Sequence, residues 1–130
     1  MDRQHVESWT AAYERAWRAP GTAALAEIFT EDATYLHGPY EESVSGLIAI
    51  GRMWEADRSG PDEVFEMSSR IVAVEGDTAV VRVDVVYGDP PTQEYRDLWI
   101  IRFAADGRCS AFEEWPFWPE QPYSAAARGE

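Results

Sequence analysis

The stretch that decides the fold is Ala79-Val80-Val81-Arg82-Val83-Asp84-Val85-Val86-Tyr87. Its β-branched residues are typical of a strand, and a strand places side chains two positions apart on the same face. Arg82 and Asp84 therefore point the same way. A buried charge without a partner is costly, so on a buried face both must pair or find other partners. Pairs of this kind are either structural or catalytic.

The second half of the chain is a succession of predicted strands. They are expected at residues 64–75, 78–87, 94–104 and 109–118. Gly76-Asp77 and Asp106-Gly107 are turn signals that join neighbouring strands as hairpins. This half is therefore predicted to form a mostly antiparallel sheet.

The first half is predicted to be mainly helical. Apolar residues between positions 6 and 17 follow the i, i+3, i+4 spacing of a helix. Thr22 is expected to cap a second, short helix that carries Phe29. A short strand is expected at 33–37 and a third helix at about 46–58. Helices followed by antiparallel strands predict an α+β fold with a curved sheet wrapped on the helices.

Length and charge limit the classes of function. The 130 residues suggest one domain, expected at 1–118, followed by a loose polar tail at 119–130. With 24 acidic and 11 basic residues, the net charge of −13 argues against nucleic-acid and anionic membrane partners. No apolar stretch approaches the length of a membrane span. The single cysteine, Cys109, and the absence of a signal-peptide pattern predict a cytoplasmic location.

Several local motifs resemble the nuclear transport factor 2-like superfamily. Residues 25–35, Leu-Ala-Glu-Ile-Phe-Thr-Glu-Asp-Ala-Thr-Tyr, resemble its passage from the second helix to the first strand. Residues 74–81 and 103–108 are similar to its two hairpins, and 112–115, Phe-Glu-Glu-Trp, to its last strand. Within this superfamily the chain most resembles the polyketide cyclase-like (SnoaL-like) proteins.

The resemblance implies a cone-shaped α+β fold in which three N-terminal helices pack on a strongly curved, mostly antiparallel sheet around an apolar pocket. It also implies a homodimer formed through the outer face of the sheet. Members of the superfamily include ketosteroid isomerases, polyketide cyclases, limonene-type epoxide hydrolases, scytalone dehydratases and binding modules without catalysis. The fold by itself therefore does not specify an activity.

The Arg82–Asp84 motif resembles the Arg-x-Asp on the corresponding strand of limonene-type epoxide hydrolases. That resemblance implies a second carboxylate at Glu114, with Tyr35 and His37 holding water or a substrate oxygen. Asp84 is then the base, Arg82 the orienting cation and Glu114 the acid. One carboxylate can take a proton from water while the other gives one to the leaving oxygen, with the arginine holding their protonation states apart.

This motif also has a structural interpretation. Val81, Val83 and Val85 form the more hydrophobic face of the same strand and are expected to compete for the core. In that case Arg82 and Asp84 lie outside, as a surface or interface ion pair that contributes little.

The other candidates also have two interpretations each. Tyr35 and His37 either position water or ligand in the pocket, or are a core tyrosine and a histidine bonded to backbone. Asp97 lies among aromatic residues on its predicted face, which would make it a second-rank acid or base with a raised pKa. Alternatively, Asp97 lies near water at the start of its strand.

Aromatic residues are abundant, with six Trp, six Tyr and five Phe. Large rings fill cores and line pockets, and together they favour an apolar or aromatic ligand. The expected lining residues are Trp17, Phe29, Trp54, Phe65, Trp99 and Phe112. No metal or cofactor is expected, because the two histidines are far apart and phosphate-binding loops, serine elbows and paired cysteines are absent.

The sequence therefore predicts a pocket for a small apolar or aromatic molecule, with cofactor-free acid–base chemistry of the hydrolase, isomerase, dehydratase or cyclase type. Two alternatives stay open. One is a binding module that uses the same pocket without turnover, and the other is an interaction domain whose outer sheet face binds another protein. The direction in which Arg82 and Asp84 point separates the hydrolase-like interpretation from these.

Overall fold

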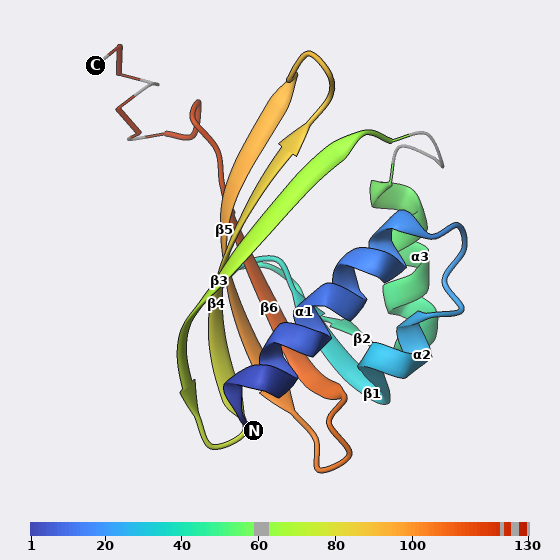
Figure 1. Cartoon of the computed structure of the whole chain (residues 1–130). Helices are drawn as coiled ribbons and strands as arrows, with labels where there is room; N and C mark the ends of the chain where they lie inside the picture. The colour runs from blue at the N-terminus through green and yellow to red at the C-terminus, as the bar shows by residue number, and fades with distance from the viewer. Residues whose placement is uncertain (59–62, 123, 126–127, 130) are drawn as a thin grey trace.

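Three helices lie against one side of a curved sheet (Figure 1). The computed structural model describes residues 1–58, 63–122, 124–125 and 128–129. Within these residues the elements are α1 (Arg3–Arg18), α2 (Leu25–Ile28), β1 (Phe29–Leu36), β2 (Val44–Ser45), α3 (Leu47–Asp57), β3 (Phe65–Glu75), β4 (Thr78–Tyr87), β5 (Gln93–Phe103) and β6 (Cys109–Phe117). The described strands form one sheet in the order β2-β1-β6-β5-β4-β3.

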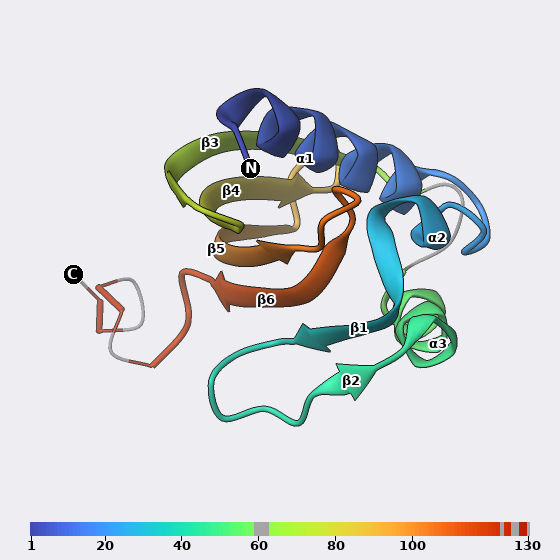
Figure 2. The same ribbon diagram turned by 90° about the horizontal axis from the view of Figure 1, so that it is seen from below.

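The sheet is mixed and open. Its strands pair in antiparallel fashion except for β1 and β6, which run parallel. Seen from below, the sheet curls around α1, while α2 and α3 close the side next to β1 (Figure 2). The predicted cone-shaped α+β fold is confirmed.

Helix α1 forms because one of its faces is apolar and both of its ends are satisfied. Val6, Trp9 and Tyr13 are buried on that face. Asp2 caps the N-terminus by accepting a hydrogen bond of 2.8 Å from the His5 backbone N–H. Arg18 in the last turn interacts favourably with the helix dipole. The helix thus presents Tyr13 to the concave side of the sheet.

The segment after α1 differs from the prediction in three ways. Helix α2 is capped at Ala24 without a side-chain hydrogen bond, so the expected cap by Thr22 is wrong. Phe29 already belongs to β1, which begins before the expected residue 33. The two-residue strand β2 was not predicted, because a pair of residues is too short to show a period. The third helix and the four later strands agree with the prediction to within about two residues.

Phe112 on β6 lies at the centre of the aromatic core. Its ring centroid is 5.7 Å from that of Trp9, 5.5 Å from Tyr13, 4.7 Å from Tyr35 and 5.1 Å from Trp99. These rings come from α1, β1 and β5, so they fix the distance between helix and sheet. The floor of the concave side is therefore rigid and apolar.

The chain beyond β6 contains no helix or strand in the residues that are described there. The division into a domain at 1–118 and a tail at 119–130 stays a prediction. None of the described helices is long and apolar enough to cross a membrane.

Candidate functional site

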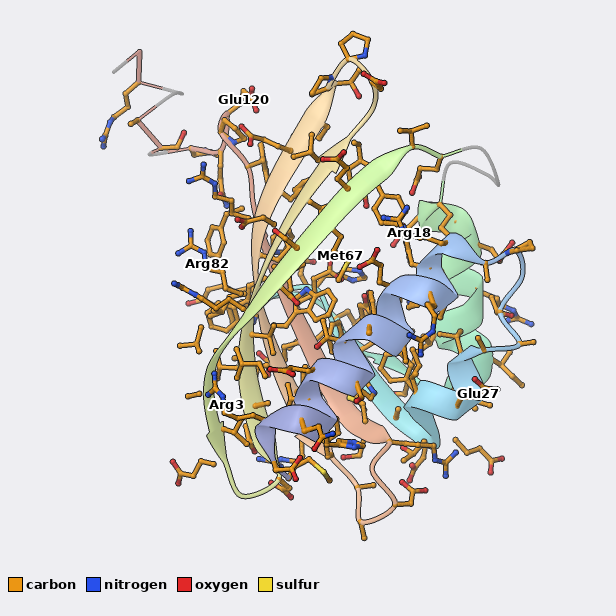
Figure 3. The ribbon with its side chains drawn as sticks, viewed as in Figure 1. Arg3, Arg18, Glu27, Met67, Arg82 and Glu120 are labelled. Carbon is orange, nitrogen blue, oxygen red and sulfur yellow. The ribbon has the colours of Figure 1, made fainter. Side chains whose placement is uncertain are left out.

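A cavity of about 670 Å³ lies on the concave side of the sheet. Trp17 at the end of α1 and Asp57 at the end of α3 line it, as do Phe65 at the start of β3 and Tyr87 at the end of β4. Met67 of β3 is another lining residue, and its side chain points toward the helices (Figure 3). The cavity therefore lies between the ends of helices and strands, next to the aromatic core, and opens to solvent.

A chain of hydroxyl and carboxylate groups runs through the cavity wall. The Tyr35 hydroxyl donates a hydrogen bond of 2.6 Å to Glu114 Oε2. The Tyr13 and Tyr35 hydroxyl oxygens are 2.7 Å apart and share a second hydrogen bond. Burial raises the pKa of both phenols well above the usual value, and the Glu114 charge raises both further. Both tyrosines are therefore neutral hydrogen-bond donors.

Asp97 and Glu114 form a carboxyl pair on neighbouring strands. Asp97 pairs with Pro116 across β5 and β6, and Trp99 pairs with Glu114, so the two acids are diagonal neighbours on one face. Burial, followed by the charge of Glu114, raises the pKa of Asp97 to about 8. Burial also raises the pKa of Glu114, although the Tyr35 hydrogen bond and the His37 charge oppose the rise. Asp97 therefore holds its proton near neutral pH, and the Tyr35 hydrogen bond favours the ionised form of Glu114.

Two buried polar atoms in the cavity wall form no well-aligned hydrogen bond, although the Trp99 indole N–H interacts with the Asp97 carboxyl group and lowers its pKa. One is the Oδ1 atom of Asp97, which is 6% exposed, and the other is the indole N–H of Trp99, which is 2% exposed. Both residues line the cavity. A buried polar group without a partner costs about 1–3 kcal/mol, which a ligand with a polar atom at this place would recover. Trp54 also has an unpaired indole N–H, but Trp54 does not line the cavity.

His37 follows β1 and lies between two acids. Its Nε2 atom is 3.8 Å from Asp57 Oδ2, and its ring centroid is 5.1 Å from that of Tyr35. The charge of His37 lowers the pKa of Glu114, whereas the charge of Asp57 raises it. The His37 side chain is half-buried at the wall of the cavity.

Arg82 and Asp84 lie outside the cavity, which corrects the catalytic roles expected for them. Both are exposed on β4, whereas Val81, Val83 and Val85 are buried. Arg82 points away from α1 (Figure 3). The physical reason is the alternation of the strand, which turns its three valines to the core and its two charges to the outer face. The structure thus brings together Tyr35, His37, Asp97 and Glu114 without the Arg82–Asp84 pair.

The expected aromatic lining divides into two groups. Trp17, Phe65 and Trp99 line the cavity as predicted. Phe29, Trp54 and Phe112 do not, because they are buried in the core beneath it.

Three functional residues were missed. The helical spacing places Tyr13 on the apolar face of α1, and the one signal for its role is that a buried tyrosine hydroxyl needs a hydrogen-bond partner. Tyr87 lines the cavity because the sheet bends, and Asp57 lines it because α3 ends there. No local sequence pattern shows either feature. Among the residues that the structure describes, no group of three or more His, Cys, Asp or Glu side chains could hold a metal ion.

Comparison with known proteins assigns the chain to a family. The SnoaL-like domain matches residues 9–112. The chain belongs to the SnoaL-like family. No curated protein sequence matches this SnoaL-like domain significantly.

Solved structures share the fold of this SnoaL-like domain. A protein described as an isomerase of the SnoaL-like family from Agrobacterium tumefaciens has 13% identity and a TM-score of 0.71, covering 88% of this chain and 98% of its own. A protein described as a polyketide cyclase from Sinorhizobium meliloti has 26% identity and a TM-score of 0.62, covering 82% and 93%. The epoxide hydrolase/cyclase-like enzyme SalBIII has 15% identity and a TM-score of 0.71, covering 89% and 93%. At 13% and 15% identity, the first and third show the fold alone.

Proposed function

We propose that this SnoaL-like domain is a cofactor-free acid–base catalyst that acts on a small apolar or aromatic molecule carrying an oxygen function. The observation that carries the proposal is the Asp97–Glu114 pair. In an aromatic-lined cavity, Asp97, whose pKa is raised to about 8, lies beside Glu114, whose ionised form the Tyr35 hydrogen bond favours. Two carboxyl groups whose environments separate their protonation states are suited to act as acid and base.

Each group has a distinct role in this proposal. The Asp97 O–H and the Trp99 indole N–H donate hydrogen bonds to the substrate oxygen and stabilise the negative charge that develops on it. Glu114 accepts a proton from the substrate carbon or from an attacking water. Tyr35 holds the Glu114 carboxylate in place, and the charge of His37 favours its ionised form. Isomerisation, cyclisation, dehydration and epoxide hydrolysis all use this pairing of an acid with a base.

The structural neighbours are consistent with this class of reaction. They include proteins described as an isomerase, a polyketide cyclase and an epoxide hydrolase/cyclase-like enzyme. The same pocket also suits a module that binds a ligand without turnover. Measured turnover separates the two.

The test uses two probes, 3-cyclohexen-1-one for isomerisation and trans-1-phenylpropylene oxide for hydrolysis. Glu114→Gln and Asp97→Asn are each expected to lower the turnover of an accepted probe by at least about 100-fold, because each removes one half of the acid–base pair. Asp84→Asn removes the same charge from the outer face and is expected to leave turnover unchanged. Equal rates in all three variants would contradict the proposal. Binding of the probes without turnover would favour the binding module.

We also propose a cytoplasmic homodimer formed through the outer face of the sheet. Leu98 and Trp115 face each other there across β5 and β6, next to Arg82, and Phe117 at the end of β6 is 47% exposed. Large apolar side chains on an uncovered sheet face favour contact with another protein chain, because the contact removes them from water. Sedimentation velocity of the wild type is expected to show a dimer, and Leu98→Glu a monomer. A wild type that sediments as a monomer would contradict this assembly and leave the interaction with another protein as the alternative for this face.

A further inference from the structure

Tyr13 of α1 lies at the far end of the hydroxyl chain that leads to Glu114. Its hydroxyl oxygen is 2.7 Å from that of Tyr35, and the Tyr35 hydroxyl donates a hydrogen bond of 2.6 Å to Glu114 Oε2. Both tyrosines are buried, and both line the cavity. The chain therefore joins the helix to β1 and β6 within the cavity wall.

The number of hydrogens fixes the direction of this chain. A tyrosine hydroxyl carries one hydrogen, and an ionised carboxylate can only accept. The single hydroxyl hydrogen of Tyr35 is therefore used by Glu114. The hydrogen between the two tyrosines must then come from Tyr13, so the chain runs from Tyr13 through Tyr35 to Glu114.

Aromatic rings from three other elements hold the Tyr13 ring in place. Its centroid is 5.0 Å from that of Trp54 on α3, 4.5 Å from Trp99 on β5 and 5.5 Å from Phe112 on β6. Such close packing leaves the ring little freedom to turn. The Tyr13 hydroxyl is thus presented to Tyr35 from a fixed position.

Hydrogen bonds in a chain polarise one another. A hydroxyl that accepts a hydrogen bond becomes a better donor, and the strengthening is about 10–30% per bond. The bond from Tyr35 to Glu114 is charge-assisted when Glu114 is ionised, so it is the stronger of the two bonds and gains most. The fixed position of Tyr13 and the polarisation therefore both act on the Glu114 carboxylate.

We propose that Tyr13 is a positioning residue of the acid–base reaction, which acts through Tyr35 to hold Glu114 in its basic form and in one orientation. The inference rests on the proposed function, because it concerns the base of the same site. It gives helix α1 a part in a reaction whose acid and base both lie on the sheet. Loss of the Tyr13 hydroxyl is expected to weaken the Tyr35 hydrogen bond and so to raise the pKa of Glu114.

Carboxyl ¹³C NMR titration of protein labelled at glutamate tests the inference. The Glu114 resonance, assigned by its loss in Glu114→Gln, is expected to titrate at least about 0.2 pH units higher in Tyr13→Phe than in the wild type. When Tyr13→Phe is added to Tyr35→Phe, it is expected to cause no further shift, because Tyr13 acts through Tyr35. An unchanged midpoint in Tyr13→Phe, or an equal shift with and without the Tyr35 hydroxyl, would overturn the inference.

Thr10→Val is the matched control on the same helix. Thr10 is buried, and its hydroxyl donates a hydrogen bond of 2.9 Å to the Val6 oxygen within α1. This variant loses a buried hydroxyl as Tyr13→Phe does, so both are expected to lower the free energy of unfolding. Only Tyr13→Phe is expected to move the Glu114 midpoint. An equal movement in both variants would show that Tyr13 has a structural role alone.

The other titratable groups that interact with Glu114 are kept in these variants, so they do not account for a difference between them. They are His37 after β1, Asp57 of α3, Tyr87 of β4 and Asp97 of β5.

The wild type offers a measurement that needs no variant. The hydroxyl protons of Tyr13 and Tyr35 are expected to exchange slowly with water and to show a nuclear Overhauser effect between them, because they are neighbours in one chain. A Tyr35 hydroxyl proton observed without that effect would overturn the inference.

Turnover separates failure of this inference from failure of the proposed function. For a probe that the wild type accepts, the lower limb of the pH profile of kcat/KM is expected to move upward in Tyr13→Phe together with the Glu114 midpoint. Turnover that falls in Glu114→Gln while this limb stays unmoved in Tyr13→Phe would keep the acid–base pair and overturn the role of Tyr13.

Discussion

The Tyr35 hydroxyl donates a hydrogen bond of 2.6 Å to Glu114 Oε2, and this contact joins the first strand to the last. It exists because β1 and β6 run parallel, with Tyr35 paired to Phe112 and Glu114 two residues further along the same face. The hydrogen bond favours the ionised form of Glu114 and opposes the effect of burial on its pKa. Tyr35 therefore helps to keep Glu114 a base rather than a second acid.

Replacement of Tyr35 tests this contact. Tyr35→Phe is expected to raise the pKa of Glu114 further, because the lost hydrogen bond had lowered it. The variant is also expected to lower the free energy of unfolding by about 1–3 kcal/mol, since the buried Tyr13 hydroxyl and Glu114 both lose a partner. Carboxyl ¹³C NMR titration and urea unfolding measure the two effects. Tyr40→Phe, at a fully exposed tyrosine, is the control and is expected to change neither.

The raised pKa of Asp97 makes the free energy of unfolding depend on pH. Its pKa is about 8 in the folded protein, above the ordinary value of 3.8, so the folded state binds more protons between these values. The contribution of Asp97 to the free energy of unfolding is therefore fully present below about pH 4. It is lost as the pH rises from there through 8. The titratable groups that interact with it are Glu114 of β6, Asp84 and Tyr87 of β4, and Tyr13 of α1.

Asp97→Asn removes this dependence, because an amide stays neutral. The variant is expected to lose less stability than the wild type between pH 5 and 9, and at pH 9 to be the more stable protein by on the order of 2 kcal/mol. Urea unfolding at a series of pH values measures the difference. A wild type whose stability rises over this range while Asp97→Asn stays level would contradict the raised pKa.

The outer position of Arg82 and Asp84 gives a further prediction. Arg82→Ala and Asp84→Asn are each expected to change the free energy of unfolding of the monomer by no more than about 0.5 kcal/mol, because both side chains are exposed on β4. Ligand binding is expected to stay as in the wild type. Loss of binding in either variant would return this pair to the site.

Helix α3 offers a matched pair of isoleucines. Ile50 is buried and Ile48 is 76% exposed on the same helix. Ile50→Ala is expected to lower the free energy of unfolding by about 2–5 kcal/mol, because it leaves a cavity in the hydrophobic core. Ile48→Ala is expected to change it by less than about 0.5 kcal/mol. Similar losses for both would mean that α3 does not pack with the face that the structure gives it.

Much of the fold could be predicted because its patterns are local. The valines of β4 alternate with charges, and the turns after β3 and β5 contain glycine with positive φ at Gly76 and Gly107. Strand β2 and the start of β1 could not be predicted, because Val44–Ser45 and Phe29 acquire their conformation from pairing with distant strands.

The candidate site was predictable only in part. Tyr35, His37 and Glu114 were found through the resemblance, and Asp97 through its aromatic neighbours. These four residues lie in one site because the sheet is curved and because Asp97 and Glu114 are diagonal neighbours on β5 and β6. No spacing in the sequence shows either relationship. The Arg82–Asp84 motif suggested a catalytic pair that the structure places outside the cavity. The sequence pattern of a strand shows which residues share a face but not which face is buried.

The titration of the Asp97 carboxyl group tests the central claim most directly. In protein labelled with ¹³C at aspartate carboxyl carbons, the Asp97 resonance, assigned by its loss in Asp97→Asn, is expected to titrate with a midpoint of about 8. A midpoint below about 5, near the ordinary aspartate value, would show that Asp97 is ionised at neutral pH and would contradict its role as the acid of the pair.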